Sequence, residues 1–466
     1  MNGPGRFSVA DPAAAVARQI FAIPLGGSDH LIYAPLKRTA FIANPALVNE
    51  ILTVCQWADG GGDASSGPSP PCTETHALLD RLDLLTPAPI PGDPFSETGP
   101  RRDTVILFPT TRCNLRCVYC YAAAGDEPVR QMPPALARAA IDTVVASVLE
   151  NGGKEISLGF HGGGEPSLHP ELIIGSADHA RRTARRHGLA LRLHGAFNGL
   201  AAPDGGVGRY ILDHFSEISL SCDGPPPIQD AQRPTVNGGP SSPAVILTMA
   251  ALDRRKVVYG IRMTVTERSV DGLAEAVAWI ADRHRPRRIQ VEPVFRRGRA
   301  RRDGLGPVPR DRFIRQFVRA RAAGKPAGVE VFYSGARLDV LTRRFCQAPC
   351  RALVVTPDGE VTACFEVHGR SHPAADRFIV GRYDGNGGFS IDRAALAAHI
   401  DRTADRLPEC DGCFCKWHCA GDCATRAAGG DSERCRLNRE LITHQLLDRI
   451  HRSGGLVWRG EPAETS

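Results

Sequence analysis

The segment TTRCNLRCVYCY, residues 110–121, places three cysteines in one loop. Cys113, Cys117 and Cys120 are separated by three residues and then by two, and no fourth cysteine stands beside them. Four thiolates complete a tetrahedral zinc or iron-sulfur site, whereas three leave one metal position open for a substrate or cofactor. We therefore interpret the three as ligands of a 4Fe-4S cluster whose fourth iron binds an exchangeable group. The alternative is a structural zinc site with a distant fourth ligand.

Length and composition narrow the class of protein. A chain of 466 residues and 50.1 kDa is long enough for two or three domains. No apolar run approaches the roughly 20 residues that span a bilayer, and the amino terminus does not resemble an export signal. We therefore expect a cytoplasmic protein with no membrane partner. The net charge of +6 is mild and does not require nucleic acid, so no nucleic-acid partner is expected.

The cysteine distribution favours metal binding over disulfides. Twelve of the fifteen cysteines fall in two groups, at residues 113–120 and 346–435. Secretory disulfides are not expected in a chain of this size without an export signal.

Six strand-like apolar segments alternate with amphipathic helical segments between residues 101 and 325. The segments are DTVILFP, EISLGFH, LALRLHG, ISLSCDG, VVYGIRMTV and RIQVEPV. This repetition predicts an α/β fold with a parallel sheet, here a partial (β/α)6 barrel of the TIM type. Chemistry is expected on the loops that follow the strands, and the three-cysteine loop follows VILFP.

Two smaller regions flank the predicted barrel. Residues 1–95 contain short strand-like segments around the turn GGSD and two helical segments, PALVNEILTVCQWA and THALLDRLDLL. Residues 340–452 begin with short strands, become dense in cysteine and close with the helical segment SERCRLNRELITHQLLDRI. We therefore predict three domains, at 1–95, 101–325 and 340–452.

The three-cysteine loop resembles the signature of the radical S-adenosylmethionine (SAM) enzymes, CxxxCxxC with an aromatic residue before the last cysteine. That aromatic residue is Tyr119 in this chain. In that family the open iron chelates SAM, and an electron from the cluster cleaves SAM to a 5′-deoxyadenosyl radical. A second match is FHGGGEP, residues 160–166. It resembles the family's GGEP loop, so Gly163, Gly164 and Glu165 are expected to hold the SAM amino group, because glycines permit close approach and a carboxylate pairs with an ammonium group.

A third match is LSCDGPPPIQDAQR, residues 220–233, which resembles the SIDGP…HDxxR stretch of peptide-modifying members. The resemblance implies that Ser221 and Arg233 contact SAM. Cys222 and Gln229 depart from the pattern, and Cys222 is expected to be a small buried residue. The resemblance further suggests a SAM contact at Asn198 and an adenine contact at Val294.

The carboxy-terminal cysteines resemble the SPASM extension of radical SAM enzymes that act on peptides, which carries auxiliary iron-sulfur clusters. By resemblance to the anaerobic sulfatase-maturing enzymes, two auxiliary clusters would each have four thiolate ligands. The first set is Cys346, Cys350, Cys364 and Cys423, and the second is Cys410, Cys413, Cys419 and Cys435. Such clusters suit electron transfer. Two structural zinc sites are the alternative, and Cys415 remains as a spare thiol, an alternative ligand or a proton donor.

Residues 18–88 resemble the small winged-helix-like peptide-chaperone domain of the pyrroloquinoline quinone pathway. Such a domain offers a strand edge to which a leader peptide adds as a further strand. A cap with no peptide role is the alternative. The basic runs RHRPRR and RRGRARR suit an acidic peptide or form solvated surface.

Together these features predict a radical SAM/SPASM maturase that abstracts hydrogen from a residue of a ribosomally synthesised peptide or a protein and yields a crosslink or an oxidised residue. Its expected partners are the precursor peptide or protein and an electron donor such as flavodoxin or ferredoxin. One alternative is an anaerobic sulfatase-maturing enzyme, although the aspartate that follows the cysteine in those enzymes is replaced by Phe365, with Glu366 next. The other is a non-catalytic metal-binding scaffold that carries a peptide.

Overall fold

The computed structural model describes residues 5–7, 19–58, 72–95, 99–426 and 432–460. The chain forms two compact units, each assembled from separate segments. The barrel unit consists of Phe95–Ser334 and Cys346–Asp401, and the terminal unit consists of Met1–Pro94, Gly335–Phe345 and Arg402–Ser466. The division into domains at 1–95, 101–325 and 340–452 stays a prediction, and residues 1–4, 8–18 and 59–71 of the first lie outside the described residues.

The barrel unit is built on one large mixed sheet whose central strands run parallel in chain order. These are β5 (Thr104–Leu107), β6 (Glu155–Phe160), β7 (Ala190–Phe197), β8 (Glu217–Ser221), β9 (Tyr259–Val265) and β10 (Arg288–Pro293). Each corresponds to one of the six apolar segments in the sequence. The predicted partial TIM-type barrel is therefore confirmed.

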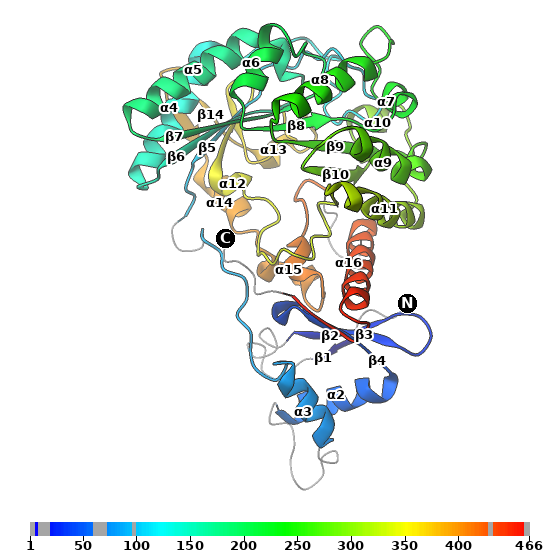
Figure 1. The fold of residues 1–466 in the computed structure, drawn as a ribbon. Coiled ribbons are helices and arrows are strands. Elements are labelled where there is room, and N and C mark those ends of the chain that lie inside the picture. Colours follow the sequence, from blue (N-terminus) through cyan, green and yellow to red (C-terminus); the bar gives the residue numbers. More distant parts are fainter. Residues whose placement is uncertain (1–4, 8–18, 59–71, 96–98, 427–431, 461–466) are drawn as a thin grey trace. The chain divides into compact units, whose positions relative to one another are not determined.

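Helices follow the strands and form an outer layer around the curved sheet (Figure 1). They are α4 (Pro134–Glu150), α5 (Pro170–Arg186), α6 (Gly206–His214), α7 (Pro226–Gln232), α8 (Ser242–Arg255), α9 (Leu273–Arg283), α10 (Gly298–Arg302) and α11 (Arg310–Gly324). Alternate strand residues bury against this layer. On β9, for example, Ile261, Met263 and Val265 are at most 2% exposed, while Arg262 on the opposite face is exposed to the barrel lumen.

Further strands extend both edges of this sheet. β11 (Glu330–Phe332) adds in parallel to β10, and β12 (Ala352–Val355) adds in parallel to β5. Beyond β12 come the antiparallel strands β13 (Glu360–Thr362), β14 (Ile379–Tyr383) and β15 (Phe389–Ile391). The short helices here are α12 (Ala348–Arg351), α13 (Ala375–Phe378) and α14 (Arg393–Ile400).

The terminal unit contains a five-stranded antiparallel sheet in the order β1-β2-β3-β4-β16. Its elements are β1 (Gly5–Phe7), β2 (Ile20–Pro24), β3 (His30–Ala34), β4 (Thr39–Ala43), α2 (Pro45–Ala58), α3 (Thr73–Arg81), α15 (Lys416–Cys419), α16 (Glu433–Arg452) and β16 (Val457–Arg459). The strands and helices expected between residues 18 and 85 are present. The pairing of β16 with β4 was not predicted. Across the ranges that the structure describes, no helix has both the length and the apolar character that crossing a membrane requires.

Candidate functional site

The three-cysteine loop, residues 113–120, begins a few residues after β5, at the carboxyl end of that strand. Its three thiols are partly buried. The backbone N–H of Leu115 donates to the sulfur of Cys113 over 3.4 Å, and that of Ala124 donates to the sulfur of Cys120 over 3.5 Å. Backbone N–H groups directed at sulfur support thiolate ligands and tune iron-sulfur clusters. The donor set therefore fits a cluster held by three thiolates.

The three thiols lie close enough for the charge of one to affect the pKa of another. Burial raises the pKa of the Cys113 thiol to about 12 and that of Cys117 to about 11, and the charge of Cys120 contributes to both increases. In the part of the chain that the structure describes, no three His, Cys, Asp or Glu side chains form a site for a single metal ion. An iron-sulfur cluster is bound differently, because each thiolate attaches to its own iron atom.

The side chain of Arg116 holds the backbone of the three-cysteine loop in place. Its guanidinium donates to the carbonyl oxygens of Cys113 at 3.0 Å, Leu115 at 2.9 Å and Gly125 at 3.2 Å. Gly125 has φ +85°, and a Cβ there would lie 2.5 Å from the guanidinium. Only glycine therefore permits this contact.

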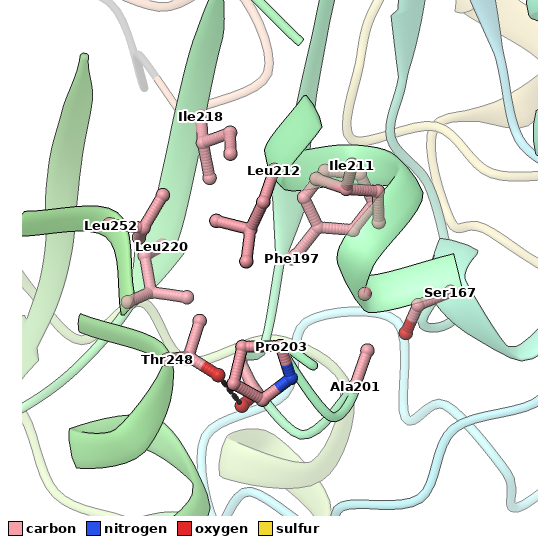
Figure 2. Close-up of a pocket in the computed structure, with 12 residues that line it drawn as sticks. Ser167, Phe197, Ala201, Pro203, Ile211, Leu212, Ile218, Leu220, Thr248 and Leu252 are labelled. Carbon is pink, nitrogen blue, oxygen red and sulfur yellow. Dashed lines mark hydrogen bonds between the residues drawn. The ribbon is translucent and has the colours of Figure 1, made fainter. Parts of the chain in front are cut away.

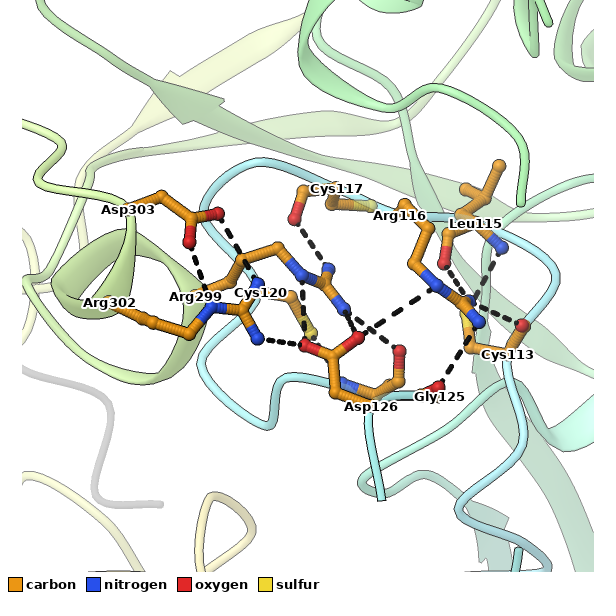
Figure 3. A network of polar contacts seen from close by, with 11 residues as sticks. Cys113, Leu115, Arg116, Cys117, Cys120, Gly125, Asp126, Arg299, Arg302 and Asp303 are labelled. Carbon is orange, nitrogen blue, oxygen red and sulfur yellow. Dashed lines mark hydrogen bonds and ion pairs between the residues drawn. The ribbon is translucent and has the colours of Figure 1, made fainter. Parts of the chain in front are cut away.

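Arg299 of α10 holds the same loop from the other side (Figure 3). Its side chain is 5% exposed and donates to the carbonyl oxygens of Cys117 at 2.8 Å and Ala124 at 3.0 Å. Asp126 pairs with Arg299 at 2.8 Å and with Arg302 at 2.7 Å. The basic run RRGRARR was expected to bind an acidic peptide or to form solvated surface. At Arg299 that expectation was wrong, because the guanidinium is buried against the three-cysteine loop.

The GGGEP loop, residues 162–166, follows β6 and packs directly on residues 110–112, which lead from β5 into the three-cysteine loop. The backbone N–H of Glu165 donates to the carbonyl oxygen of Arg112 over 2.8 Å. A Cβ at Gly164 would lie 2.4 Å from that same oxygen, and a Cβ at Gly163 would lie 2.9 Å from the side chain of His368. Both glycines are therefore required by close packing.

Glu165 is buried, with 3% exposure, and its carboxylate accepts three hydrogen bonds. The donors are the backbone N–H and the hydroxyl of Ser167, at 3.1 and 2.6 Å, and the backbone N–H of Asn198, at 2.8 Å. The side chain of Asn198 in turn donates to Asn114 over 2.7 Å. Burial raises the pKa of Glu165 to about 7, although these hydrogen bonds oppose the increase. Glu165 and Asn198 thus connect the loops after β6 and β7 to the three-cysteine loop.

Asp223 is a site residue that the sequence reasoning missed. Its carboxylate is 2% exposed and binds both the Nε and Nη2 of Arg233, each at 3.0 Å. It also accepts the hydroxyl of Tyr119, whose ring lies 5.2 Å from the Arg233 guanidinium. Tyr119 and Arg233, both expected beside SAM, are therefore joined through Asp223. The signal was present in the sequence, because this aspartate stands inside the SCDG motif.

The two departures in this motif have structural roles. Gln229 accepts the backbone N–H of Asp223 over 2.9 Å and donates to the Ser241 hydroxyl over 3.0 Å. Cys222 is 1% exposed, as expected for a small buried residue. Val294, the expected adenine neighbour, is 8% exposed and continues β10 by donating to the Val265 carbonyl.

Polar side chains occupy the lumen face of the barrel strands. Arg262 is paired in register with Ser221 on β8 and with Gln290 on β10. His194 lies over Gly159, where a Cβ would be 2.3 Å from its ring. The Arg262 guanidinium makes no ion pair or hydrogen bond with any described residue, although its charge lowers the pKa of His161. The guanidinium of Arg262 can therefore bind an anionic or hydrogen-bond-accepting group in the lumen.

The loop after Cys364 lies beside the GGGEP loop and the lumen. The ring of Phe365 lies 6.0 Å from that of His161 and packs on the apolar side chains of β5 and β12. Glu366 pairs with Arg297 at 3.7 Å, and its charge acts on both His161 and Tyr121. Burial lowers the pKa of His161 to about 3, so this imidazole is neutral at physiological pH.

A separate cavity of about 30 Å³ lies between the sheet and the helices α6 and α8 (Figure 2). Its lining is mostly apolar, including Ile218, Leu220 and Leu252, and Thr248 donates to the Gly199 carbonyl over 2.8 Å. This volume holds about one or two waters. It belongs to the outer layer of the barrel and is too small to bind a nucleoside.

The second predicted set of auxiliary ligands lies entirely in the terminal unit. Burial raises the pKa of the Cys410 thiol, and the charges of Cys413 and Cys435 add to this increase. Burial also raises the pKa of the Cys419 thiol, and the charges of Cys413 and Cys410 add to it. The four thiols are thus neighbours. Cys415, the remaining thiol, is 1% exposed and hydrogen-bonds to Cys413.

The first predicted set is divided between the two units. Cys346, Cys350 and Cys364 belong to the barrel unit, and Cys423 belongs to the terminal unit, so this ligand set stays a prediction. Two of these thiols accept backbone N–H groups, Cys346 from Ala348 at 3.5 Å and Cys364 from Glu366 at 3.4 Å.

The cysteine-rich segment, residues 410–423, packs against one face of the terminal sheet. Trp417 is fully buried, and its indole N–H donates to Gln19 over 2.7 Å. The His418 ring hydrogen-bonds to the Tyr33 hydroxyl over 2.6 Å. The opposite face of the sheet packs against α2 and α3. The predicted peptide-recognition module and the predicted second cluster site therefore share one sheet.

Fold and site together define a class of protein: the chain is related to the radical SAM/SPASM-type maturases. These homologues are enzymes that bind AdoMet, which is SAM, and iron-sulfur clusters, and the cysteine-rich carboxy-terminal region of this chain fits auxiliary clusters. No family model matches the chain.

Particular relatives support this assignment. The chain is 26% identical over 345 residues to a serine-type anaerobic sulfatase-maturating enzyme of Klebsiella aerogenes, covering 69% of this chain and 80% of the relative. It is 26% identical over 186 residues to the pre-heme d1 synthase of Dinoroseobacter shibae, covering 40% of this chain and 42% of that enzyme. The fold is similar to that of native anSMEcpe with bound AdoMet, with a TM-score of 0.56 and 17% identity over 75% of this chain and 99% of that one.

Proposed function

We propose that the chain is a radical SAM/SPASM enzyme that modifies a residue of a ribosomally synthesised peptide, forming a crosslink or an oxidised residue. The supporting observation is the three-cysteine loop, whose backbone is held by the guanidinium groups of Arg116 and the buried Arg299 while its three thiols lie close together at the lumen of the barrel. When bound and reduced, a 4Fe-4S cluster there supplies the electron that cleaves SAM to a 5′-deoxyadenosyl radical, and auxiliary clusters can accept the electron released as product forms.

The chain's own residues would bind and orient the reactants. Glu165 offers a carboxylate to the SAM ammonium group, and Gly163 and Gly164 allow close approach of the backbone. Asp223 binds Tyr119 and Arg233 and would hold both in position to contact SAM. The remaining proposed SAM contacts are Asn198, Ser221 and Val294.

The lumen would bind the peptide. Arg262 offers hydrogen-bond donors and forms no ion pair with the residues that the structure describes, and the neutral ring of His161 offers a donor and an acceptor. Glu366 provides a carboxylate that can accept the proton lost on oxidation. Holding the target carbon in one position directs a radical to that carbon rather than to the protein.

A second candidate function is sulfatase maturation, which the coverage of the Klebsiella aerogenes relative favours. Against it stands Phe365, whose apolar ring cannot serve as a base and packs against β5 and β12. In that function Glu366 would have to act as the base, one residue further along the chain.

The two functions are distinguished by their products. Anaerobically reconstituted protein should release 5′-deoxyadenosine from SAM under dithionite, and co-expression with candidate precursor peptides encoded by neighbouring genes should change the mass of one of them. Serine- and cysteine-containing sulfatase peptides should remain unmodified. Conversion of the serine or cysteine of such a peptide to formylglycine, with no change in any candidate precursor peptide, would favour sulfatase maturation. Absence of deoxyadenosine from cluster-loaded protein would contradict both functions.

A further inference from the structure

One edge of the five-stranded sheet in the terminal unit is formed by β16, which pairs with β4. β16 pairs antiparallel with β4, in the register Val457 with Phe41, Trp458 with Ala40 and Arg459 with Thr39. The backbone N–H of Gly460 continues the pairing by donating to the Arg38 carbonyl over 2.9 Å. Figure 1 shows this strand, in red, within the blue sheet of the terminal unit. A strand edge that would otherwise present unpaired backbone groups is thereby covered.

The three residues of β16 have different surroundings. Val457 packs on the apolar cluster formed by the sheet with α2 and α3. Trp458 points to the opposite face, because side chains alternate along a strand, and is 7% exposed. Arg459 donates to the carbonyl oxygen of Arg81, the last residue of α3, over 3.1 Å. The β4 edge therefore recognises an aliphatic, an aromatic and a basic side chain in succession.

β16 is weakly connected to the rest of the unit. It is only three residues long, shorter than a typical strand. It follows α16 through Gly454 and Gly455, at φ +91° and +82°, and then Leu456, which is 77% exposed. α16 itself is held independently of β16, because its residues Leu441, Leu446 and Ile450 are at most 2% exposed. The strand can therefore leave the edge by rotation at the two glycines without moving α16.

We propose that β16 is a displaceable strand, which occupies the β4 edge until an extended segment of the peptide substrate replaces it. The segment would carry the aliphatic-aromatic-basic pattern of residues 457–459 and add to β4 as a strand. The identity of the partner rests on the proposed function, but occupation of the edge by β16 does not. The same site thus keeps the protein's sheet edge closed in the absence of substrate.

The first test uses a chain truncated after Gly454 and a fluorescein-labelled synthetic peptide of residues 455–462. The truncated chain should bind the peptide in the micromolar range, about tenfold or more tighter than the full-length chain, which competes with its own strand. A peptide in which Trp458 is replaced by alanine should bind weakly to both. Equal binding of the peptide to the two folded chains, or no binding to either, would overturn the proposal.

A pair of full-length variants provides a second test that does not depend on truncation. Val457→Asp places a charge in the apolar cluster and should release β16, so that peptide binding rises and the amides of Thr39–Phe41 exchange faster. Leu456→Asp, at the neighbouring exposed position, should leave both unchanged. Equal behaviour of the two variants, or global unfolding of Val457→Asp, would show that β16 is a permanent part of the fold.

The partner is tested with the precursor peptide that gains mass on co-expression. That peptide should displace the labelled probe from the truncated chain, and failure to compete would overturn the assignment of the partner. SAM cleavage is measured on the same samples. Loss of 5′-deoxyadenosine with intact probe binding would contradict the proposed function alone, whereas normal cleavage without probe binding would contradict the edge proposal alone.

Discussion

The three-cysteine loop and the cysteine-rich segment are held in different ways. In the barrel unit, Arg116 and Arg299 bind backbone carbonyls of the loop, so its sulfur atoms take little part in holding it. In the terminal unit, Trp417 and His418 fix the cysteine-rich segment by burial against the sheet, among four neighbouring thiols. The difference suggests that the first region is built to keep a metal position open, and the second to enclose one.

The largest expected effect comes from removing one thiol of each region. Cys117→Ala should abolish SAM cleavage and lose about four iron atoms per chain while the barrel stays folded, because the loop is held by its backbone. Cys413→Ala should instead lower thermal stability, because a cluster there would stabilise a segment with a small apolar core. Iron content, deoxyadenosine release and anaerobic thermal melts measure both effects. Equal loss of thermal stability in the two variants would show that the two cysteine regions do not differ in how they are held.

Arg299→Met tests whether the buried guanidinium group holds the loop. It removes the buried donor of the Cys117 and Ala124 carbonyls and one of the two close arginine partners of the Asp126 carboxylate, which should cost about 3 kcal/mol of unfolding free energy. Arg302→Met is the matched control, because Arg302 binds the same carboxylate but is 55% exposed, and its effect should be small. Chemical denaturation of the metal-free proteins gives the comparison. Similar losses of unfolding free energy in both variants would show that the burial of Arg299 does not determine its contribution to stability.

Trp417→Phe tests the packing of the cysteine-rich segment. The ring is largely retained, but the buried Gln19 amide loses its donor, which should cost about 1–3 kcal/mol. The additional variant Gln19→Leu should recover part of this loss, because it removes the unpaired polar group. Thermal melts of the single and double variants test this, and an additive loss in the double variant would contradict it.

The smallest effect is a pH dependence of SAM binding. The pKa of Glu165 is raised to about 7, so the carboxyl is neutral below that pH and ionised above it. An ammonium group binds the ionised form, so SAM affinity should rise by up to about tenfold per pH unit as the pH increases towards 7 and then level off. Glu165→Gln should show weaker binding with no such dependence. Isothermal titration from pH 6 to 8 measures it, and an unchanged profile in the variant would exclude Glu165 as the group that titrates.

The sequence predicted most of the fold because each barrel strand is a short apolar run followed by an amphipathic helix, and both patterns are local. It also indicated the three-cysteine loop and the GGGEP loop, since spacing alone defines them. Arg299 was missed because its contacts join residues 117 and 299, and a buried arginine cannot be distinguished by type from an exposed one. β16 was missed for a related reason. Three residues carry too little periodicity to predict a strand, and its pairing with β4 spans more than 400 positions of the chain.

The central claim is that Cys113, Cys117 and Cys120 hold a cluster with one iron open to SAM. Electron paramagnetic resonance of the dithionite-reduced, iron-loaded protein tests it directly. Added SAM should shift the cluster signal in the wild type and in Cys413→Ala, and Cys117→Ala should show no shift. A signal that SAM leaves unchanged in fully loaded wild-type protein would contradict the claim.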